Sequence, residues 1–282
     1  MTATRSRTVG SDRRPAGIVT DLDGTFWYDD GEVHPATLAA IAELRRRDVP
    51  LLFATGRRGR SASHRLARHD LLGPAVLLAG AVGTDLHTGQ EWHRQAFAPE
   101  AGLRVLDAFL AEGLSPVVHV SLPDIDAVIA PDCPTSDRHR AQFDMATVPT
   151  DPHEPVAAGV AVGFGLLSLT GERGLAAHRV AQAIAGDATV TCGLDTTFGG
   201  ITVLAAPVGV NKVTGISRWA TAQGLAADDL LAVGDGENDL DMLAWAGHTV
   251  AIEGSVANGI ATDHVIDVPE RGGWAGLLEL LG

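Results

Sequence analysis

The sequence predicts an α/β protein, with a doubly wound parallel core sheet and an α+β domain inserted into it. Short apolar runs alternate with amphipathic stretches from Gly17 to Ala79 and again from Val210 onward, a pattern typical of strand–helix–strand units. At Thr84 the pattern changes to that of hairpins and paired strands. These two observations give the expected organisation: a disordered tail over 1–16, a core over 17–83 and 206–282, and an inserted domain over 84–205.

The first part of the core reads as three strands separated by two helices. Pro35 suits the first position of a helix, and Leu38, Ile41 and Leu44 recur at helical spacing after it. The Gly73-Pro74 pair would end the second helix. The expected strands are Gly17–Thr20, Pro50–Ala54 and Ala75–Ala79, and the expected helices are 35–47 and 59–70.

The inserted domain reads as an antiparallel layer with helices. Thr88-Gly89-Gln90 marks the centre of a hairpin over 85–94. The proline-rich and charged stretch 131–155 gives no assignment. The other expected elements are helices over 100–112 and 172–185 and strands over 117–120, 126–130, 159–169 and 200–205.

The second part of the core returns to strand–helix alternation. The apolar run Leu230–Val233 closes in the acidic sequence Gly234-Asp235-Gly236-Glu237-Asn238-Asp239, which leads into a helical stretch. The expected helices are 213–223 and 237–246, and the expected strands are 230–233, 248–252 and 264–268.

Composition excludes several classes of protein. The chain has 282 residues, of which 45% are hydrophobic, enough for a packed core, and none of its apolar runs approaches the roughly 20 residues that span a bilayer. A net charge of −14 disfavours nucleic acid and anionic membranes as partners. The only cysteines, Cys133 and Cys192, are far apart and no signal peptide precedes them, so we expect neither disulfides nor a zinc site, and a cytoplasmic location.

Polar side chains follow three separate apolar runs at the carboxyl end of each. They are Asp21, Thr55 and Asp235. Ligands of open parallel sheets collect beyond the carboxyl ends of the strands, so we expect these groups to meet there. Together with Asp23 and Asp239, the acids would repel one another strongly unless a cation compensated, and oxygen ligands favour Mg²⁺ over zinc. Taken alone, the acids around Asp235 would also serve to cap the following helix.

The acids after the first strand suit phosphoryl transfer. A carboxylate can attack a phosphate ester to form a covalent aspartyl-phosphate, and we assign this role to Asp21. Asp23 is the expected general acid and base, while Gly24 permits a tight turn and Thr25 fixes the loop. Preorganised donors must surround the transferring oxygens, and the candidates are Thr55, Gly56, Lys212 and Asn238.

Four segments in this order resemble the motifs of the haloacid dehalogenase-like phosphohydrolases. They are Asp21-Leu22-Asp23-Gly24-Thr25, Thr55-Gly56-Arg57, Asn211-Lys212 and Gly234-Asp235-Gly236-Glu237-Asn238-Asp239. The resemblance implies a Rossmann-like core and a Mg²⁺ site made by Asp21, the carbonyl of Asp23 and Asp235. It also implies that the Leu22 amide, Thr55, Gly56, Lys212 and Asn238 hold phosphate, with Asp239 and Arg57 as supporting residues.

The place of the insert, between Thr55 and Lys212, is similar to that of a type IIB cap. The motif that continues as Leu240-Asp241-Met242-Leu243 is similar to the subgroup of Cof-type sugar phosphatases, sucrose-phosphatase-like enzymes and phosphomannomutases. The chain departs from the Cof pattern at Ala79-Gly80-Ala81, where Asn-Gly-Ala is usual. Possible cap contacts to a leaving group are Trp92, His93, His119, Asp195 and Phe198.

The expected function is Mg²⁺-dependent hydrolysis of a small phosphate monoester, with a sugar phosphate as the substrate class. A sugar phosphomutase would use the same chemistry and differ only in whether water or a second hydroxyl reaches the phosphoaspartate. A phosphosugar-binding regulator without turnover is a further alternative, although intact acids at Asp21 and Asp23 count against it. The sequence sets neither the leaving group nor the oligomeric state.

Overall fold

The computed structural model describes residues 14–29, 31–122, 124–134, 147–149, 151–194, 199–259 and 262–281. Most of the expected tail, residues 1–13, lies outside this range, as do Asp195 and Phe198. The chain forms two compact units, and each contains segments far apart in the sequence. The first contains the described residues of 1–28, 32–51 and 220–282; the second contains those of 29–31 and 52–219.

The first unit is built on parallel strands. In spatial order they are β14 (His264–Ile266), β13 (His248–Ile252), β12 (Leu230–Gly234) and β1 (Gly17–Thr20), and each pairs in parallel with the next. Every residue of β1 and β12 is buried, as expected where helices cover both faces of a parallel sheet. The fold class is therefore α/β, as predicted.

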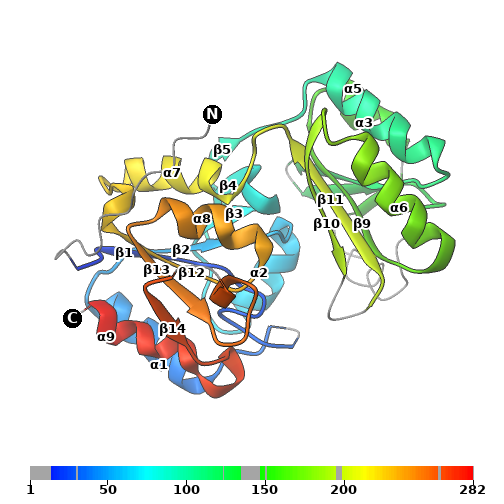
Figure 1. Ribbon diagram of the computed structural model, residues 1–282. Helices are drawn as coiled ribbons and strands as arrows, with labels where there is room; N and C mark the ends of the chain where they lie inside the picture. The colour runs from blue at the N-terminus through cyan, green and yellow to red at the C-terminus, as the bar shows by residue number, and fades with distance from the viewer. Residues whose placement is uncertain are drawn as a thin grey trace, which may run out of the picture. The chain divides into compact units, whose positions relative to one another are not determined.

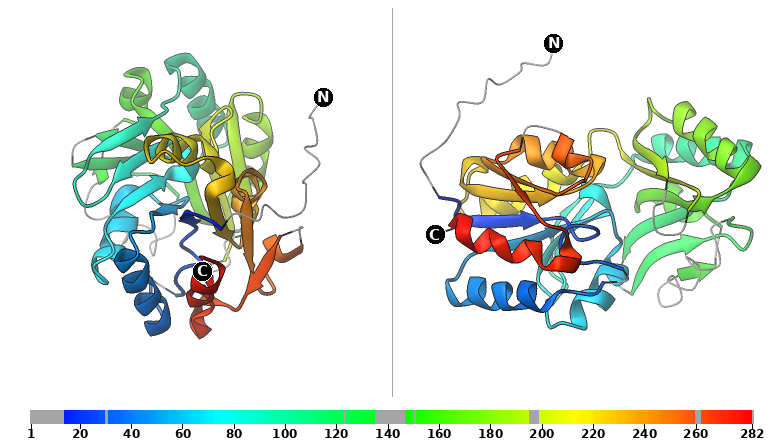
Figure 2. Two further views of the ribbon diagram at one scale, coloured as in Figure 1. Left: turned by 90° about the vertical axis from the view of Figure 1, so that its left-hand side faces the viewer. Right: turned by 60° about the horizontal axis from the view of Figure 1, so that its bottom comes forward.

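The longest described helix of the first unit begins with a local capping signal. In α1 (Pro35–Arg46), proline takes the first position and the His34 Nδ1 atom accepts the Ala36 amide at 3.1 Å. The other helices are α8 (Leu240–Trp245) and α9 (Leu277–Leu281), and α9 lies beside α1 (Figures 1 and 2). Trp274, fully buried just before α9, packs edge-to-face on Phe26 with ring centroids 5.2 Å apart.

The second unit begins with β2 (Leu51–Ala54), α2 (Gly59–Ala67) and β3 (Pro74–Leu77), a parallel strand–helix–strand unit. β4 (Val82–Asp85) then pairs antiparallel with β3, and β5 (Glu91–Arg94) pairs antiparallel with β4. β3 stops at Leu77 and not at Ala79 because Leu78 and Ala79 have positive φ angles, which no strand can contain. The unit closes with α7 (Lys212–Ala222).

A six-stranded sheet forms the rest of the second unit. Its order is β10 (Ala188–Leu194), β11 (Ile201–Pro207), β9 (Ala161–Leu169), β6 (Val117–Leu122), β7 (Ile125–Ile129) and β8 (Thr147–Pro149). All pairs are antiparallel except β7 with β8. The helices α3 (Pro99–Ala111), α5 (His153–Ala157) and α6 (Gly171–Ala183) gather on one face of it (Figure 1). Phe164 of β9 contacts Phe97 and Phe109 in the core between them.

Some elements differ from the sequence prediction. β10 and β8 have no predicted counterpart, and neither has α5. The predicted helix 237–246 is a single 3₁₀ turn over Glu237–Asp239 followed by α8. β4 and β11 cross the predicted domain boundaries at 84 and 205, and those boundaries stay a prediction. Among the described residues, none of the helices is long and apolar enough to cross a bilayer.

Candidate active site

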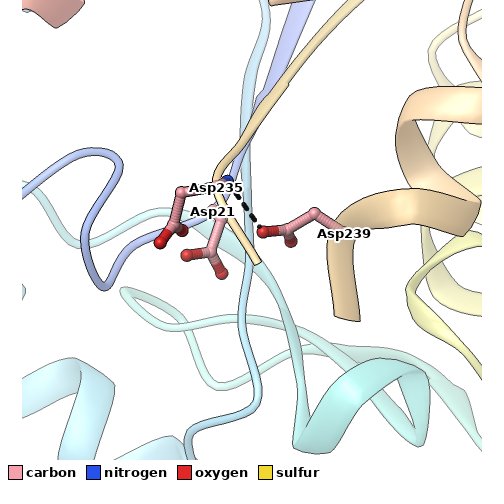
Figure 3. Close-up of side chains that lie close together, drawn as sticks. All are labelled: Asp21, Asp235 and Asp239. Carbon is pink, nitrogen blue, oxygen red and sulfur yellow. Dashed lines mark hydrogen bonds between the residues drawn. The ribbon is translucent and has the colours of Figure 1, made fainter. Parts of the chain in front are cut away.

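Asp21 and Asp235 meet because the strands that precede them are neighbours. β1 and β12 run in parallel with Thr20 opposite Val233, and the Asp21 amide donates to the Val233 carbonyl at 2.9 Å. Each aspartate is the first residue beyond its strand. Together with Asp239, they offer carboxylate oxygens that all lie within 4.8 Å of one another (Figure 3). The structure thus brings three of the predicted acids to one edge of the sheet.

The burial of these acids makes their mutual repulsion significant. Asp21 is 4% exposed, Asp239 is fully buried and Asp235 is half-buried. Like charges at such separations cost several kcal/mol at the effective dielectric of about 20 that suits protein sites. The ligand set consists of oxygen atoms alone, which suits a hard cation such as Mg²⁺ better than zinc. The residues present therefore fit the implied metal.

Asp239 also holds the loop that carries Asp235. Its Oδ2 atom accepts the backbone amides of Asp235 at 3.0 Å and Gly236 at 2.9 Å, and Figure 3 shows the first of these bonds. These bonds join residues only three or four positions apart in the sequence, and residues 237–239 between them form a 3₁₀ turn. Asn238 is exposed, and its Oδ1 atom lies 2.5 Å from the place where a Cβ on Gly236 would be. The Asn238 side chain thus folds back over the loop.

The loop after β1 turns tightly against Asp235. The Leu22 carbonyl accepts the amides of Phe26 at 2.9 Å and Trp27 at 3.0 Å, and the Leu22 side chain is fully buried. Gly24 has φ +73°, and a Cβ there would lie 2.7 Å from the Asp235 Oδ2 atom. The Thr25 hydroxyl donates to the Asp235 Oδ1 atom at 2.9 Å. The loop therefore places Asp235 by direct contact.

Asp23 stands apart from the three gathered carboxylates. Its Oδ1 atom accepts the indole N–H of Trp27 at 3.0 Å, and the Trp27 ring is fully buried. A buried ring offers one fixed donor, so this bond orients the Asp23 carboxylate. Sequence reasoning missed this function of Trp27; the available signal was an indole four residues after the acid within one tight turn.

Thr55 and its neighbours belong to the second unit. Thr55, 1% exposed, follows β2, and its hydroxyl accepts the Arg57 amide at 3.1 Å. Gly56 is open on its side-chain face, where, of the residues that the structure describes, only Leu204 comes within 4 Å. The Arg57 guanidinium donates to the Ser61 hydroxyl at 3.0 Å.

Lys212 also belongs to the second unit, where it begins α7. It is 1% exposed and is the only lysine of the chain. Burying an ammonium group costs free energy unless other groups compensate for it. The sequence uses arginine at all its other Lys or Arg positions, so a buried lysine at this position points to a specific role. That Thr55, Gly56, Arg57 and Lys212 share one phosphate site with the acids of the first unit stays a prediction.

Comparison with known proteins gives the family. A model described as haloacid dehalogenase-like hydrolase matches residues 18–152 and 183–275. An HMP-PP phosphatase of Enterobacter sp. (strain 638) is 29% identical over 243 residues, which cover 80% of this chain and 80% of that protein. Another, of Klebsiella pneumoniae (strain 342), is 40% identical over 92 residues, but the match spans only 30% of this chain and 31% of the relative.

Solved structures share the fold. A haloacid dehalogenase-like hydrolase from Bacteroides thetaiotaomicron superposes with a TM-score of 0.76 at 18% identity, over 95% of this chain and 100% of that one. A HAD/COF-like hydrolase from Plasmodium vivax gives a TM-score of 0.77 at 17% identity, over 95% of each chain. At such identities the likeness concerns the fold alone.

Proposed function

The chain belongs to the haloacid dehalogenase-like hydrolases, and on this premise we propose that it is a Mg²⁺-dependent phosphatase of small phosphate monoesters. The observation that carries the proposal is the convergence of Asp21, Asp235 and Asp239 within 4.8 Å at the carboxyl ends of β1 and β12. A bound Mg²⁺ would offset the repulsion of these acids and draw the phosphate of the substrate toward them.

In the proposed reaction, a carboxylate oxygen of Asp21 attacks the phosphorus, and the bond from phosphorus to the ester oxygen breaks. Asp23 gives its proton to the leaving alkoxide. Water then attacks the phosphorus of the aspartyl-phosphate, Asp23 takes a proton from it, and inorganic phosphate leaves with Asp21 restored. The bond from Trp27 supports this role, because its N–H comes from a buried ring and helps to orient the Asp23 carboxylate.

The groups that hold phosphate are proposed to be the Leu22 amide, Thr55, Gly56, Lys212 and Asn238. Their donors would face charge that spreads over the transferring oxygens. Burial supports the roles of Thr55 and Lys212, since each is 1% exposed and each stands where an element begins or ends. Asp239 supports the site through its bonds to the Asp235 loop.

We propose sugar phosphates as the substrate class, from the likeness of the motifs to the Cof-type subgroup. HMP-PP is the second candidate substrate, because relatives named HMP-PP phosphatases match this chain. A reducing cytoplasm is supported by the low cysteine content, because the sequence has only Cys133 and Cys192. The net charge of −14 fits a small phosphorylated partner held in a local site better than a nucleic acid.

The test is a phosphate-release screen over hexose, disaccharide, polyol and nucleotide monophosphates and HMP-PP, with and without Mg²⁺. We expect release from at least one of them that depends on Mg²⁺ and is lost in Asp21→Asn. Release that is indifferent to the metal, or retained by Asp21→Asn, would refute the proposal. Turnover that requires a bisphosphate activator would instead favour the phosphomutase.

A further inference from the structure

A strained loop of the second unit, residues 78–80, lies between two of the segments that we propose to bind phosphate. Leu78, Ala79 and Gly80 have φ angles of 49°, 53° and 116° in succession. Leucine and alanine rarely adopt such angles, and they persist only where surrounding contacts fix them. The contacts of this loop therefore show what it is held against.

On one side the loop is bonded to the segment that carries Thr55. The Ala79 amide donates to the Thr55 carbonyl at 3.1 Å, and the Leu78 amide donates to the Arg57 carbonyl at 3.0 Å. Because these bonds reach Thr55 and Arg57, which are two residues apart, they fix both the position and the direction of the 55–57 segment relative to the loop.

On the other side the loop abuts the turn before Lys212. A Cβ on Gly80 would overlap the carbonyl group of Asn211 and lie 3.0 Å from the Lys212 amide nitrogen. Only glycine permits this approach of one backbone to another. The start of α7, and with it the position from which the Lys212 side chain extends, is therefore set against Gly80.

His93 of β5 holds the loop from behind. Its Nε2 atom lies 3.1 Å from the Gly80 carbonyl oxygen, and because a carbonyl only accepts, Nε2 carries the hydrogen. The ring is 6% exposed, and burial, followed by the charge of Arg218, lowers the pKa of His93. His93 is thus a fixed donor to Gly80, the residue of the loop whose backbone lies against Asn211.

We infer that His93 is a positioning residue for phosphate binding, which acts through loop 78–80 to set where Lys212 and Thr55 lie. The inference rests on the proposed function. Gly80 has no side chain to anchor it, so the bond from His93 to the Gly80 carbonyl restrains the loop against α7.

The test uses the single lysine of the chain. In protein labelled with ¹³C-lysine, the side-chain signal of Lys212 stands alone and reports its surroundings without turnover. We expect His93→Leu to shift this signal and to weaken its response to inorganic phosphate with Mg²⁺. With p-nitrophenyl phosphate, kcat/KM should fall by up to about 100-fold, mainly in kcat, as small misplacements of catalytic groups do. His93→Gln keeps an N–H donor and should restore most of the loss.

Two matched controls separate positioning from general damage. His69 also bonds a glycine carbonyl through Nε2, that of Gly31 at 3.0 Å, but not next to this loop, so His69→Leu should leave Lys212 unaffected. Gly80→Ala should displace the signal as His93→Leu does. Gly89→Ala should not, because φ is +72° there and no atom of the described part of the chain lies within 4 Å of the added Cβ.

Failure of this inference and failure of the proposed function give different results. If His93→Leu leaves the Lys212 signal and kcat/KM as in the wild type, or if His93→Gln loses as much as His93→Leu, the inference is wrong. If the wild type releases no phosphate, the proposed function fails while the Lys212 signal still tests the positioning. Should His93→Leu not fold, Gly80→Ala against Gly89→Ala decides.

Discussion

Gly24 and Trp27, both in the loop after β1, help to set the positions of the acids of the candidate site. Gly24 leaves room for the Asp235 carboxylate, and Trp27 donates to Asp23. At the scale of single residues, Asp21 and Asp235 could be predicted, because each directly follows an apolar run that is visible in the sequence. The partner of an indole N–H could not, since it depends on how the loop folds back over four residues.

Gly24→Ala should weaken the metal site. The left-handed φ of +73° costs a residue with a Cβ about 1–2 kcal/mol, and the added methyl would press on Asp235 Oδ2 from 2.7 Å. We expect the Mg²⁺ concentration needed for half-maximal phosphate release to rise about tenfold, the equivalent of 1.4 kcal/mol. Gly254→Ala is the control, because its φ is +74° and none of the residues described by the structure comes within 4 Å of the added Cβ. Equal Mg²⁺ titrations of the two variants would contradict the account.

Trp27→Phe should impair proton transfer without weakening substrate binding. The substitution keeps a buried ring and removes only the N–H that orients Asp23. Since general acid–base catalysis contributes about 10²–10⁴-fold, a misaligned Asp23 should lower kcat by at least tenfold with KM little changed. Steady-state kinetics check this, with Trp219→Phe in α7 as a buried control. A rise in KM alone would argue against this role for Trp27.

The six-stranded sheet is the element whose stability should respond to acid. His119 of β6 is 7% exposed, and the Asp126 carboxylate, which pairs with Arg58, lies near it. Burial lowers the pKa of His119 to about 4; the Arg58 charge adds to this effect, and Asp126 opposes it. The ring is therefore neutral in the folded protein at neutral pH.

The direction of the pH effect on stability follows from the difference between the pKa of His119 in the folded chain and in the unfolded chain. An unfolded histidine has a pKa near 6.5, so the unfolded chain binds more protons than the folded one between about pH 6.5 and pH 4. The free energy of unfolding should fall across this window as the pH is lowered, by about 3 kcal/mol at most from this residue. Urea unfolding at several pH values should show a shallower fall in His119→Gln. Equal slopes in both proteins would contradict the assignment.

Helices and strands could be predicted from the sequence where several local signals agree. Pro35 and the spacing of Leu38, Ile41 and Leu44 locate α1. β10 was missed because it is an edge strand that is largely exposed and therefore lacks an apolar run. The helix predicted over 237–246 is divided at Asp239, whose side chain accepts the amides of Asp235 and Gly236, and the spacing of apolar residues does not reveal these bonds.

Each compact unit of the molecule is built from segments that are far apart in the sequence. Residues near 20 and near 235 join in the first, and residues near 55 and near 212 in the second. The order of strand and helix signals predicted the α/β class, and the fold of solved hydrolases agrees with it. The domain boundaries stay a prediction, and the strands β4 and β11 run across the two predicted positions.

Mg²⁺ should stabilise the folded chain as a whole. The gathered acids exist only in the folded state, so a metal that binds them shifts the equilibrium by about 2.7 kcal/mol when its free concentration is 100 times the Kd. Denaturant unfolding with and without Mg²⁺ measures this, and Asp235→Asn should lose most of the gain. Identical stabilisation of both proteins would place the ion elsewhere.

We expect Asp21 to become covalently phosphorylated during turnover. To detect this, the enzyme is acid-quenched within its first turnovers on a substrate from the screen and reduced with borohydride, and its peptides are sequenced by mass spectrometry. We predict a modified residue at Asp21 that requires both substrate and Mg²⁺. Rapid Mg²⁺-dependent phosphate release, with Asp21 unmodified at every quench time or with the label on another residue, would contradict the account.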